Sequence, residues 1–205
     1  MNAQDWAQLD RYKKANSTLD LDTVDMVFMG DSITEGWSQF RPSFFTNGFV
    51  CRGIGGQTTP QMLLRFRQDV INLAPKKVIL LAGINDIAQN TGPITLDQIM
   101  DNIKSMTEMA KANNIEMILC SLLPANSFPW RPEITPTQKV IQLNQMIKTY
   151  AEENKLYYVD YYAAMVNESN GLQQHLGYDT VHPNAAGYQV MEQVLMEEIK
   201  AIHGH

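Results

Sequence analysis

The sequence predicts an α/β fold, a three-layer α/β/α sandwich built on a five-stranded parallel sheet of order 2-1-3-4-5. Five short runs with strand character alternate along the chain with longer amphipathic stretches. The runs are almost continuously apolar, which is typical of parallel strands that helices cover on both faces. The expected strands are Val24–Met29, Phe49–Arg52, Lys77–Leu81, Met117–Leu122 and Leu156–Asp160.

The amphipathic stretches carry helix start signals followed by apolar faces. A Thr before a Pro combines an N-cap with a favoured residue of the first turn, and Thr-x-x-Gln is a capping-box pattern. The start patterns are Thr59-Pro60, Thr95-x-x-Gln98 and Thr135-Pro136-Thr137-Gln138, and a last helix is expected from about Asn184 to Ile202. The apolar faces are Leu63, Phe66, Val70 and Leu73; Ile99, Ile103, Met106 and Ala110; and Val140, Leu143 and Ile147.

Length, composition and charge narrow the class of protein. The chain has 205 residues, 44% apolar and 19% charged, which fits a single globular domain spanning residues 1–205. The net charge of −6 argues against a nucleic-acid partner, because phosphate binding needs a basic surface. No apolar stretch approaches the length of a membrane span, so no membrane span is expected. The oligomeric state stays open.

Localisation also stays open at this point. The first residues, Met1–Trp6, have neither the basic nor the apolar region of a secretory leader. We therefore expect either a cytoplasmic protein or the mature form of a secreted or periplasmic one.

The most informative feature is the serine that follows the first expected strand. Ser32 lies in Gly30-Asp31-Ser32-Ile33, directly after a buried run and at the expected start of a helix. Backbone N–H groups and the helix dipole favour a developing negative charge at such a position. A serine there becomes a nucleophile when a base can reach it.

The far end of the chain offers that base. In Asp179-Thr180-Val181-His182-Pro183, a carboxylate stands three residues before a histidine. Two glycine-rich turns, Gly53-Ile54-Gly55-Gly56-Gln57-Thr58 and Gly83-Ile84-Asn85-Asp86, lie between serine and histidine and offer oxyanion donors. A nucleophile, a base, an orienting acid and oxyanion donors together predict a serine esterase.

Placement gives this pattern more weight than any single motif. Ser32 follows the first strand, Gly56 the second and Asn85 the third. In a 2-1-3-4-5 sheet these strands are neighbours, and ligands bind beyond their carboxyl ends, near the point where the strand order reverses. We expect the three residues to meet in one crevice.

Each of these residues also has a plainer structural interpretation. Asp31 and Ser32 can be N-caps of the next helix, and Asn85 can cap the segment that follows it. The glycines can be turn residues with positive φ. Asp179 and His182 can form a loop hydrogen bond without a catalytic role.

Other protein classes use parts of the same pattern. In flavodoxin-like proteins the loop after the first strand cradles phosphate, and Asp31-Ser32-Ile33-Thr34 offers hydroxyl and N–H groups for that. Such a site leaves Asn85, Asp179 and His182 without a role. The α/β-hydrolase elbow requires Gly-x-Ser-x-Gly, but Thr34 takes the place of the second glycine. A non-catalytic carbohydrate- or phosphate-binding module and an acyltransferase remain alternatives.

No metal or cofactor is expected. His203 and His205 have no partner ligands at zinc spacing, and Cys51 and Cys120 lack metal or redox spacing. The cysteines belong to the second and fourth strands, with two strands expected between them. Strands lie about 4.8 Å apart, so the thiols should be on the order of 14 Å apart, beyond the roughly 7 Å Cα limit of a disulfide. Both should be free.

The ordered motifs resemble the SGNH hydrolases, also called the GDSL lipase and esterase family, across nearly the whole chain. The four matching blocks are Gly30-Asp31-Ser32, Gly53–Thr59, Gly83-Ile84-Asn85-Asp86 and Asp179–Pro183. The resemblance implies that Ser32 is the nucleophile, His182 the base and Asp179 its orienting acid. It also implies that Ser32, Gly56 and Asn85 supply the oxyanion donors.

The resemblance is most specific in the middle blocks. These blocks and Leu122-Leu123-Pro124 look most like the branch that contains the platelet-activating-factor acetylhydrolase catalytic subunits and bacterial carbohydrate acetylesterases. Gln57 departs from the pattern, because relatives often have Asp there, but this changes no catalytic assignment.

The expected substrate is a small ester of a polar alcohol, such as an acetylated carbohydrate. No long apolar insertion is present to enclose a fatty chain, so a small acyl pocket is expected. The proline-rich loop from Pro124 to Pro136 follows the fourth strand and should stand over the carboxyl edge of the sheet. Its Phe128, Trp130 and Arg131 are candidates for binding a sugar ring, together with Asp31 beside the nucleophile. Alternatively, Trp130 only anchors its own loop.

Overall fold

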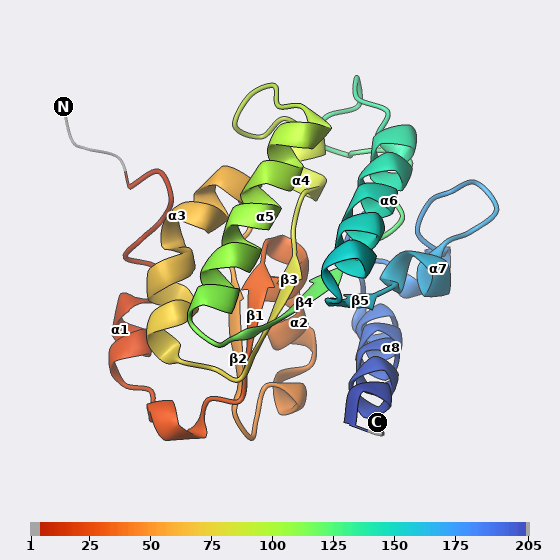
Figure 1. The fold of residues 1–205 in the computed structure, drawn as a ribbon. Helices are drawn as coiled ribbons and strands as arrows, with labels where there is room; N and C mark the ends of the chain where they lie inside the picture. Colours follow the sequence, from red (N-terminus) through yellow and green to blue (C-terminus); the bar gives the residue numbers. More distant parts are fainter. Residues whose placement is uncertain (1–4, 204–205) are drawn as a thin grey trace.

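The computed structural model describes residues 5–203, whose five strands form one parallel sheet in the predicted order, β2-β1-β3-β4-β5 (Figure 1). The strands are β1 (Met26–Gly30), β2 (Phe49–Gly53), β3 (Lys77–Leu81), β4 (Glu116–Cys120) and β5 (Tyr157–Val159). The ends of β2, β1 and β3 are level, because Gly30 pairs with both Gly53 and Leu81. The segments that follow these strands therefore start at the same edge.

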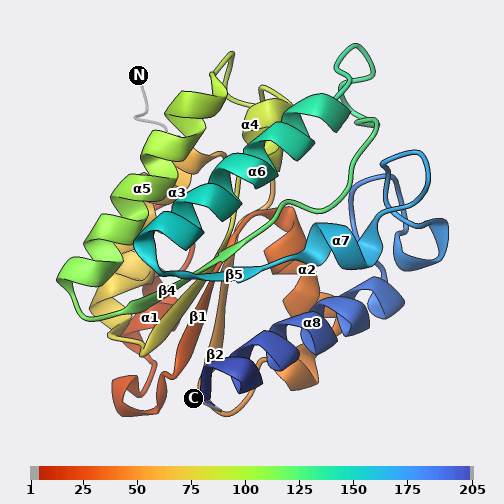
Figure 2. The ribbon, with the colours of Figure 1, turned by 45° about the vertical axis from the view of Figure 1, so that its right-hand side comes forward.

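Helices cover both faces of the sheet, as the three-layer prediction requires (Figure 2). On one face, α3 (Thr59–Asp69) packs against α5 (Leu96–Ala112), and α5 packs against α6 (Thr137–Asn154). On the other face, α2 (Ser32–Phe40) packs against α8 (Ala185–His203), which also contacts α7 (Tyr161–Met165). The shorter elements are α1 (Lys13–Ser17), α4 (Ile84–Ile87) and the 3₁₀ turns Leu21–Thr23, Pro42–Phe44, Ile71–Leu73 and Gln174–Leu176.

The helix caps agree with the sequence in part. α5 has the predicted capping box of Thr95 and Gln98. The cap of α3 lies one residue earlier than predicted, at Thr58, whose N–H donates to the Gln61 side chain at 3.0 Å. The predicted cap of α6 is wrong, because Pro136 occupies the N-cap position and offers no side-chain hydrogen bond.

The apolar face predicted for α5 is fully buried, whereas the face of α3 differs from the prediction. α3 ends at Asp69, so Val70 and Leu73 are buried in a separate turn rather than in the helix. The buried side of α3 includes a charged pair, Arg65 and Asp69, whose side chains are 0% exposed and 3.0 Å apart. Charged residues are rarely buried unless paired, which this pair satisfies.

Both cysteines are free, as predicted. Cys51 lies on β2 and Cys120 on β4, with β1 and β3 between them. Within residues 5–203, no helix combines the length and apolarity that crossing a bilayer would require. The side chain of His203, and His205 altogether, lie outside the part of the chain described.

Candidate active site

Ser32 is the first residue of α2 and follows β1 after a single intervening residue, Asp31. Asp31 is the N-cap of α2, and its Oδ1 accepts from the N–H of Ile33 at 2.9 Å. Its carboxyl group points inward, with 1% of the residue exposed. Capping the helix turns its side chain into the protein, and the expectation that Asp31 binds substrate stays a prediction.

Burial has a consequence for the charge of Asp31. Its Oδ2 is buried and has no hydrogen-bond partner among the described residues. Desolvation of the carboxylate raises the pKa of Asp31 to about 7, although the Ile33 N–H acts against the shift. A neutral carboxyl group on the residue before Ser32 is therefore substantially populated near neutral pH.

The three residues of the predicted triad are in hydrogen-bond contact. Ser32 Oγ lies 2.9 Å from His182 Nε2, and His182 Nδ1 lies 2.8 Å from Asp179 Oδ2. The second carboxylate oxygen of Asp179 accepts from the N–H groups of Val181 and His182 at 2.8 and 2.7 Å. This is the nucleophile–base–orienter geometry that hydrolytic triads require.

The electrostatics of Asp179 suit an orienting carboxylate. Partial burial acts to raise its pKa, but the N–H groups of His182 and Val181 and the imidazole outweigh burial, so the pKa of Asp179 lies below its usual value. Asp179 therefore remains ionised at neutral pH and can hold a proton on Nδ1 of His182.

Contacts between α8 and α2 bring serine and histidine together across 150 positions of sequence. The Tyr188 hydroxyl donates to the Ile33 carbonyl at 2.8 Å, one residue after the serine. Further along α8, Glu192 accepts from Trp37 and Arg41 of the α2 region. The segment that follows His182 is thus fixed to the helix that begins at Ser32.

The first glycine-rich turn lies beside Ser32. A Cβ atom added to Gly55 would lie 3.8 Å from the Ser32 Cβ and 3.0 Å from the Glu35 carboxylate, which accepts from the Gly55 N–H at 2.8 Å. Gly56 has a φ of +75°, a left-handed conformation that favours glycine. The turn is therefore held close to the nucleophile by Glu35 of α2.

The second turn carries Asn85, which is 3% exposed and lies in α4 directly after β3. Its Nδ2 donates to the Gln57 carbonyl of the first turn at 3.0 Å. The neighbouring Asp86 accepts from the N–H and the hydroxyl of Thr59 at the start of α3. Thr59 thus binds Asp86 instead of serving as the predicted cap, and the two turns are hydrogen-bonded to each other.

The proline-rich loop reaches this edge of the sheet, as predicted. Trp130 is 39% exposed, its ring centroid lies 5.9 Å from that of His182, and its Nε1–H donates to Asn90 Oδ1 at 3.1 Å. Phe128 is only 1% exposed and packs against Trp130 with ring centroids 5.1 Å apart, so its contact with substrate stays a prediction. Arg131 is half-buried and pairs with Glu133 at 3.6 Å.

Comparisons with known proteins agree with this architecture. Residues 28–190 match the model of the GDSL-like Lipase/Acylhydrolase family. The chain belongs to this family. Membership of this acylhydrolase family identifies the chain as a carboxylic ester hydrolase.

Relatives and solved structures give the family assignment more detail. A GDSL-like lipase from Bacteroides thetaiotaomicron is 46% identical, with a TM-score of 0.92 over 96% of this chain and 98% of that one. An acetylxylan esterase from Geobacillus stearothermophilus is 27% identical over 73% of this chain and 71% of its own length. The human platelet-activating factor acetylhydrolase IB subunit alpha2 is 24% identical over 91% and 82%.

Two residues beside the GDSL-type motifs escaped the sequence analysis. Tyr178, 60% exposed, stacks on His182 with ring centroids 5.4 Å apart. Its position directly before Asp179 is a signal that could have found it. Asn90 contacts Trp130, Asn85 and Gly56, but it belongs to no motif of the family and had no sequence signal.

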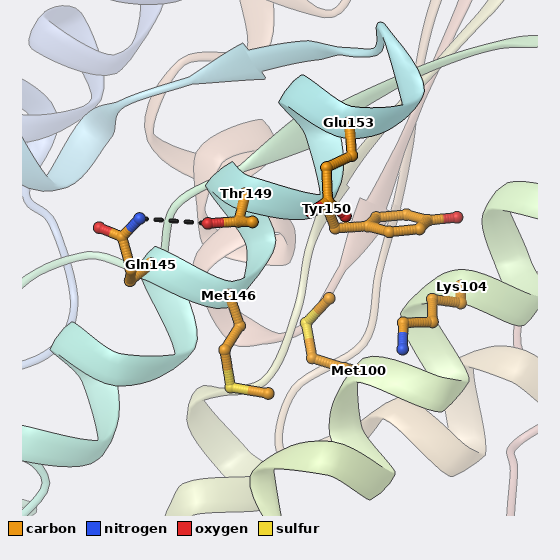
Figure 3. Close-up of a pocket in the computed structure, with 7 residues that line it drawn as sticks. All are labelled: Met100, Lys104, Gln145, Met146, Thr149, Tyr150 and Glu153. Carbon is orange, nitrogen blue, oxygen red and sulfur yellow. Dashed lines mark hydrogen bonds between the residues drawn. The ribbon is translucent and has the colours of Figure 1, made fainter.

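A cavity of about 270 Å³ lies elsewhere, between α5 and α6 (Figure 3). Met100 and Lys104 of α5 face Met146, Tyr150 and Glu153 of α6 across it. None of its lining residues belongs to the GDSL-type motifs, so it is separate from the candidate site.

Proposed function

We propose that this chain is a serine esterase that hydrolyses short-chain carboxylic esters through Ser32, His182 and Asp179. The observation that carries the proposal is the continuous hydrogen-bonded series from Ser32 Oγ through both ring nitrogens of His182 to Asp179. A loop hydrogen bond without a catalytic role would explain the Asp179–His182 contact, but it would not explain why Nε2 faces a serine at a helix start.

The proposed reaction follows from these positions. Ser32 Oγ attacks the ester carbonyl carbon while His182 Nε2 takes the hydroxyl proton. The tetrahedral intermediate then expels the alcohol, which receives that proton from His182, and an acyl-serine remains. Water, deprotonated by His182, attacks the acyl-serine and releases the carboxylic acid. Asp179 keeps the imidazole in the required tautomer and stabilises its protonated form.

We assign the oxyanion site to the backbone N–H groups of Ser32 and Gly56 and to Nδ2 of Asn85. One proton of Nδ2 is used by the Gln57 carbonyl, which leaves the other for substrate. In comparable sites, one such donor contributes about 2.7–4 kcal/mol to transition-state stabilisation. A catalytic mutant of the Geobacillus acetylxylan esterase has a serine replaced by alanine, which supports a serine mechanism for that relative.

Ser32→Ala tests the mechanism. The variant should lose hydrolysis of nitrophenyl acetate while its thermal unfolding stays that of a folded protein. An organophosphonate should label Ser32 of the wild-type chain, and the labelled peptide is identified by mass spectrometry. Full activity in Ser32→Ala, or labelling at another residue, would refute the assignment.

We further propose that the substrate is an acetyl ester of a carbohydrate or a similar polar alcohol. The segments that follow β1, β2 and β3 at the sheet edge are short turns, which leaves little wall for a long acyl chain. Trp130 and Tyr178, both exposed and both against His182, offer ring faces on which a sugar can stack. The acetylxylan esterase among the relatives supports this choice.

Acyl length and alcohol recognition are tested separately. Among acetyl, butyryl and octanoyl nitrophenyl esters, the acetyl ester should have the highest kcat/KM, and a preference for octanoate would contradict the small pocket. Trp130→Ala should lower kcat/KM more for acetylated xylo-oligosaccharides than for nitrophenyl acetate. Trp130→Phe, which keeps a ring, should leave the ratio of these two values close to that of the wild type.

A further inference from the structure

We propose that Asn90 is a positioning residue that orients the oxyanion donors and is itself held by the indole N–H of Trp130. This inference rests on the proposed function, because it concerns the donors assigned there. Asn90 contacts none of the triad residues through a hydrogen bond in the described structure, yet its amide bonds to Trp130, Asn85 and the Gly56 carbonyl.

The chemistry of the two ends sets the direction of this series of hydrogen bonds. An indole Nε1–H can only donate, so the Asn90 atom that faces Trp130, at 3.1 Å, must be the acceptor Oδ1. The amide nitrogen of Asn90 then faces Asn85, 3.0 Å away, and the Asn85 atom that receives it must be Oδ1. At the other end, the Gln57 carbonyl can only accept, which again requires the Asn85 nitrogen on that side.

Asn85 is thereby fixed in one of two possible amide orientations. An asparagine side chain turned by 180° exchanges a donor for an acceptor, and an oxygen aimed at an oxyanion repels it. Because Asn90 donates to Asn85 Oδ1, the NH₂ group of Asn85 is directed to Gln57 and keeps one proton for the substrate. The Trp130 indole N–H and the Gln57 carbonyl thus fix the amide orientations of Asn90 and Asn85 from opposite ends of the series.

Asn90 also acts on the glycine turn. Its Nδ2 lies 3.2 Å from the Gly56 carbonyl oxygen, so one amide group bonds to both turns that carry oxyanion donors. Gly56 has no side chain to restrict its backbone, and its φ of +75° is one that glycine leaves easily. A fixed carbonyl limits the rotation of the peptide beside the Gly56 N–H.

The proline-rich loop is bonded to the other half of the site as well. Thr180, between Asp179 and His182, donates its hydroxyl proton to the Ser127 carbonyl at 3.2 Å. The loop therefore contacts the base segment through Ser127 and the oxyanion donors through Trp130 and Asn90. A substrate that stacks on Trp130 therefore contacts the residue whose indole N–H holds Asn90.

Asn90→Asp is the most direct test, because the carboxylate still accepts from Trp130 but cannot donate to Asn85 or Gly56. Removing a whole oxyanion donor lowers kcat by about 10²–10³-fold, so misorienting one should lower kcat at least roughly tenfold. KM for nitrophenyl acetate should change less than about threefold, since the interaction is made in the transition state. Asn113→Asp, an exposed asparagine at the end of α5, is the matched control and should keep wild-type kinetics.

A double-mutant cycle separates positioning from simple loss of stability. If Asn90 acts through Asn85, Asn90→Asp should lower kcat by a clearly smaller factor in an Asn85→Ala background than in the wild type. Equal factors in both backgrounds, or a wild-type kcat for Asn90→Asp, would overturn the proposal. Trp130→Phe keeps the ring but loses the N–H, and it should share part of the kcat loss.

NMR gives a readout that does not depend on turnover. The Trp130 indole proton should exchange with solvent more slowly in the wild type than in Asn90→Ala, and the side-chain NH₂ signals of Asn85 should shift in both Asn90→Asp and Trp130→Phe. Unchanged Asn85 signals in these variants would overturn the proposal. A wild-type chain that neither hydrolyses esters nor is labelled at Ser32 would instead refute the proposed function, while these signals still decide the amide orientation.

Discussion

The helices α3 and α5 lie next to each other on the same face of the sheet, yet they bury different chemistry (Figure 1). α5 buries Ile99, Ile103 and Met106 in the apolar core, and its half-buried Asn102 donates to the Thr59 hydroxyl at 3.0 Å. α3 buries Arg65 and Asp69 at the same depth, and its polar groups reach the segments that carry the site. Both helices thus fill the core and contact the site segments, but only α3 of the two does so through a buried charged pair, which sequence periodicity does not describe.

Arg65 illustrates what α3 adds. Its guanidinium donates to Asp69, to the Gly30 carbonyl directly before Asp31, and to the Gln57 side chain directly after Gly56. One buried cation therefore bonds to the turn of the nucleophile and to the glycine turn. Leaving a buried charge such as Arg65 without its partners lowers the free energy of unfolding strongly, which favours the folded positions of Gly30 and Gln57.

The largest expected effect on stability is that of Arg65→Met. Among residues 5–203, Asp69 would keep only the Asn16 amide as a hydrogen-bond partner while remaining buried, so the unfolding free energy should fall by about 3–5 kcal/mol. kcat should fall as well, because Gly30 and Gln57 lose their donor. Urea unfolding and steady-state kinetics on the same preparations measure the two effects.

Ile103→Val is the matched control on α5. It removes one buried methylene group, which typically costs about 0.5–1.5 kcal/mol, and should leave kcat unchanged. If both variants lowered kcat in proportion to their loss of stability, α3 would have no special connection to the site and the contrast between the helices would fail.

A smaller effect concerns Asp31, a buried carboxyl group that lacks the partner that Asp69 has. Because its folded-state pKa of about 7 lies above the unfolded value near 3.9, the folded protein binds this proton more tightly. The stability it contributes is complete below pH 4 or so and is lost as pH rises through about 7. Asp31→Asn keeps a capping side chain but cannot ionise.

The substitution should therefore stabilise the protein more at pH 8 than at pH 5, by a difference on the order of 1–3 kcal/mol. Urea unfolding of both proteins at the two pH values measures it. If the difference in unfolding free energy between the two proteins does not change with pH, Asp31 is ionised throughout this range and its folded-state pKa is not raised.

The sequence was sufficient for the sheet, for the α5 face and for the convergence of Ser32, Gly56 and Asn85, because each depends on local periodicity or on the order of strands. The burial of Arg65 could not be predicted from the sequence. An Arg and an Asp four residues apart look the same in sequence whether the pair is exposed or enclosed. The position of the Asn90 side chain depends on the loop conformation. Gln89, directly before it, has a φ of 57°, and no sequence pattern there predicts a left-handed residue.

The distance in sequence between nucleophile and base has a consequence for the growing chain. Synthesis proceeds from the N-terminus, so all five strands, Ser32 and both oxyanion turns exist before His182 has been made. The base then becomes fixed as α8 docks on α2 through Tyr188 and Glu192. A nascent chain therefore contains Ser32 and both glycine-rich turns while it still lacks His182, and the proposed hydrolysis requires that the C-terminal segment be made and docked on α2.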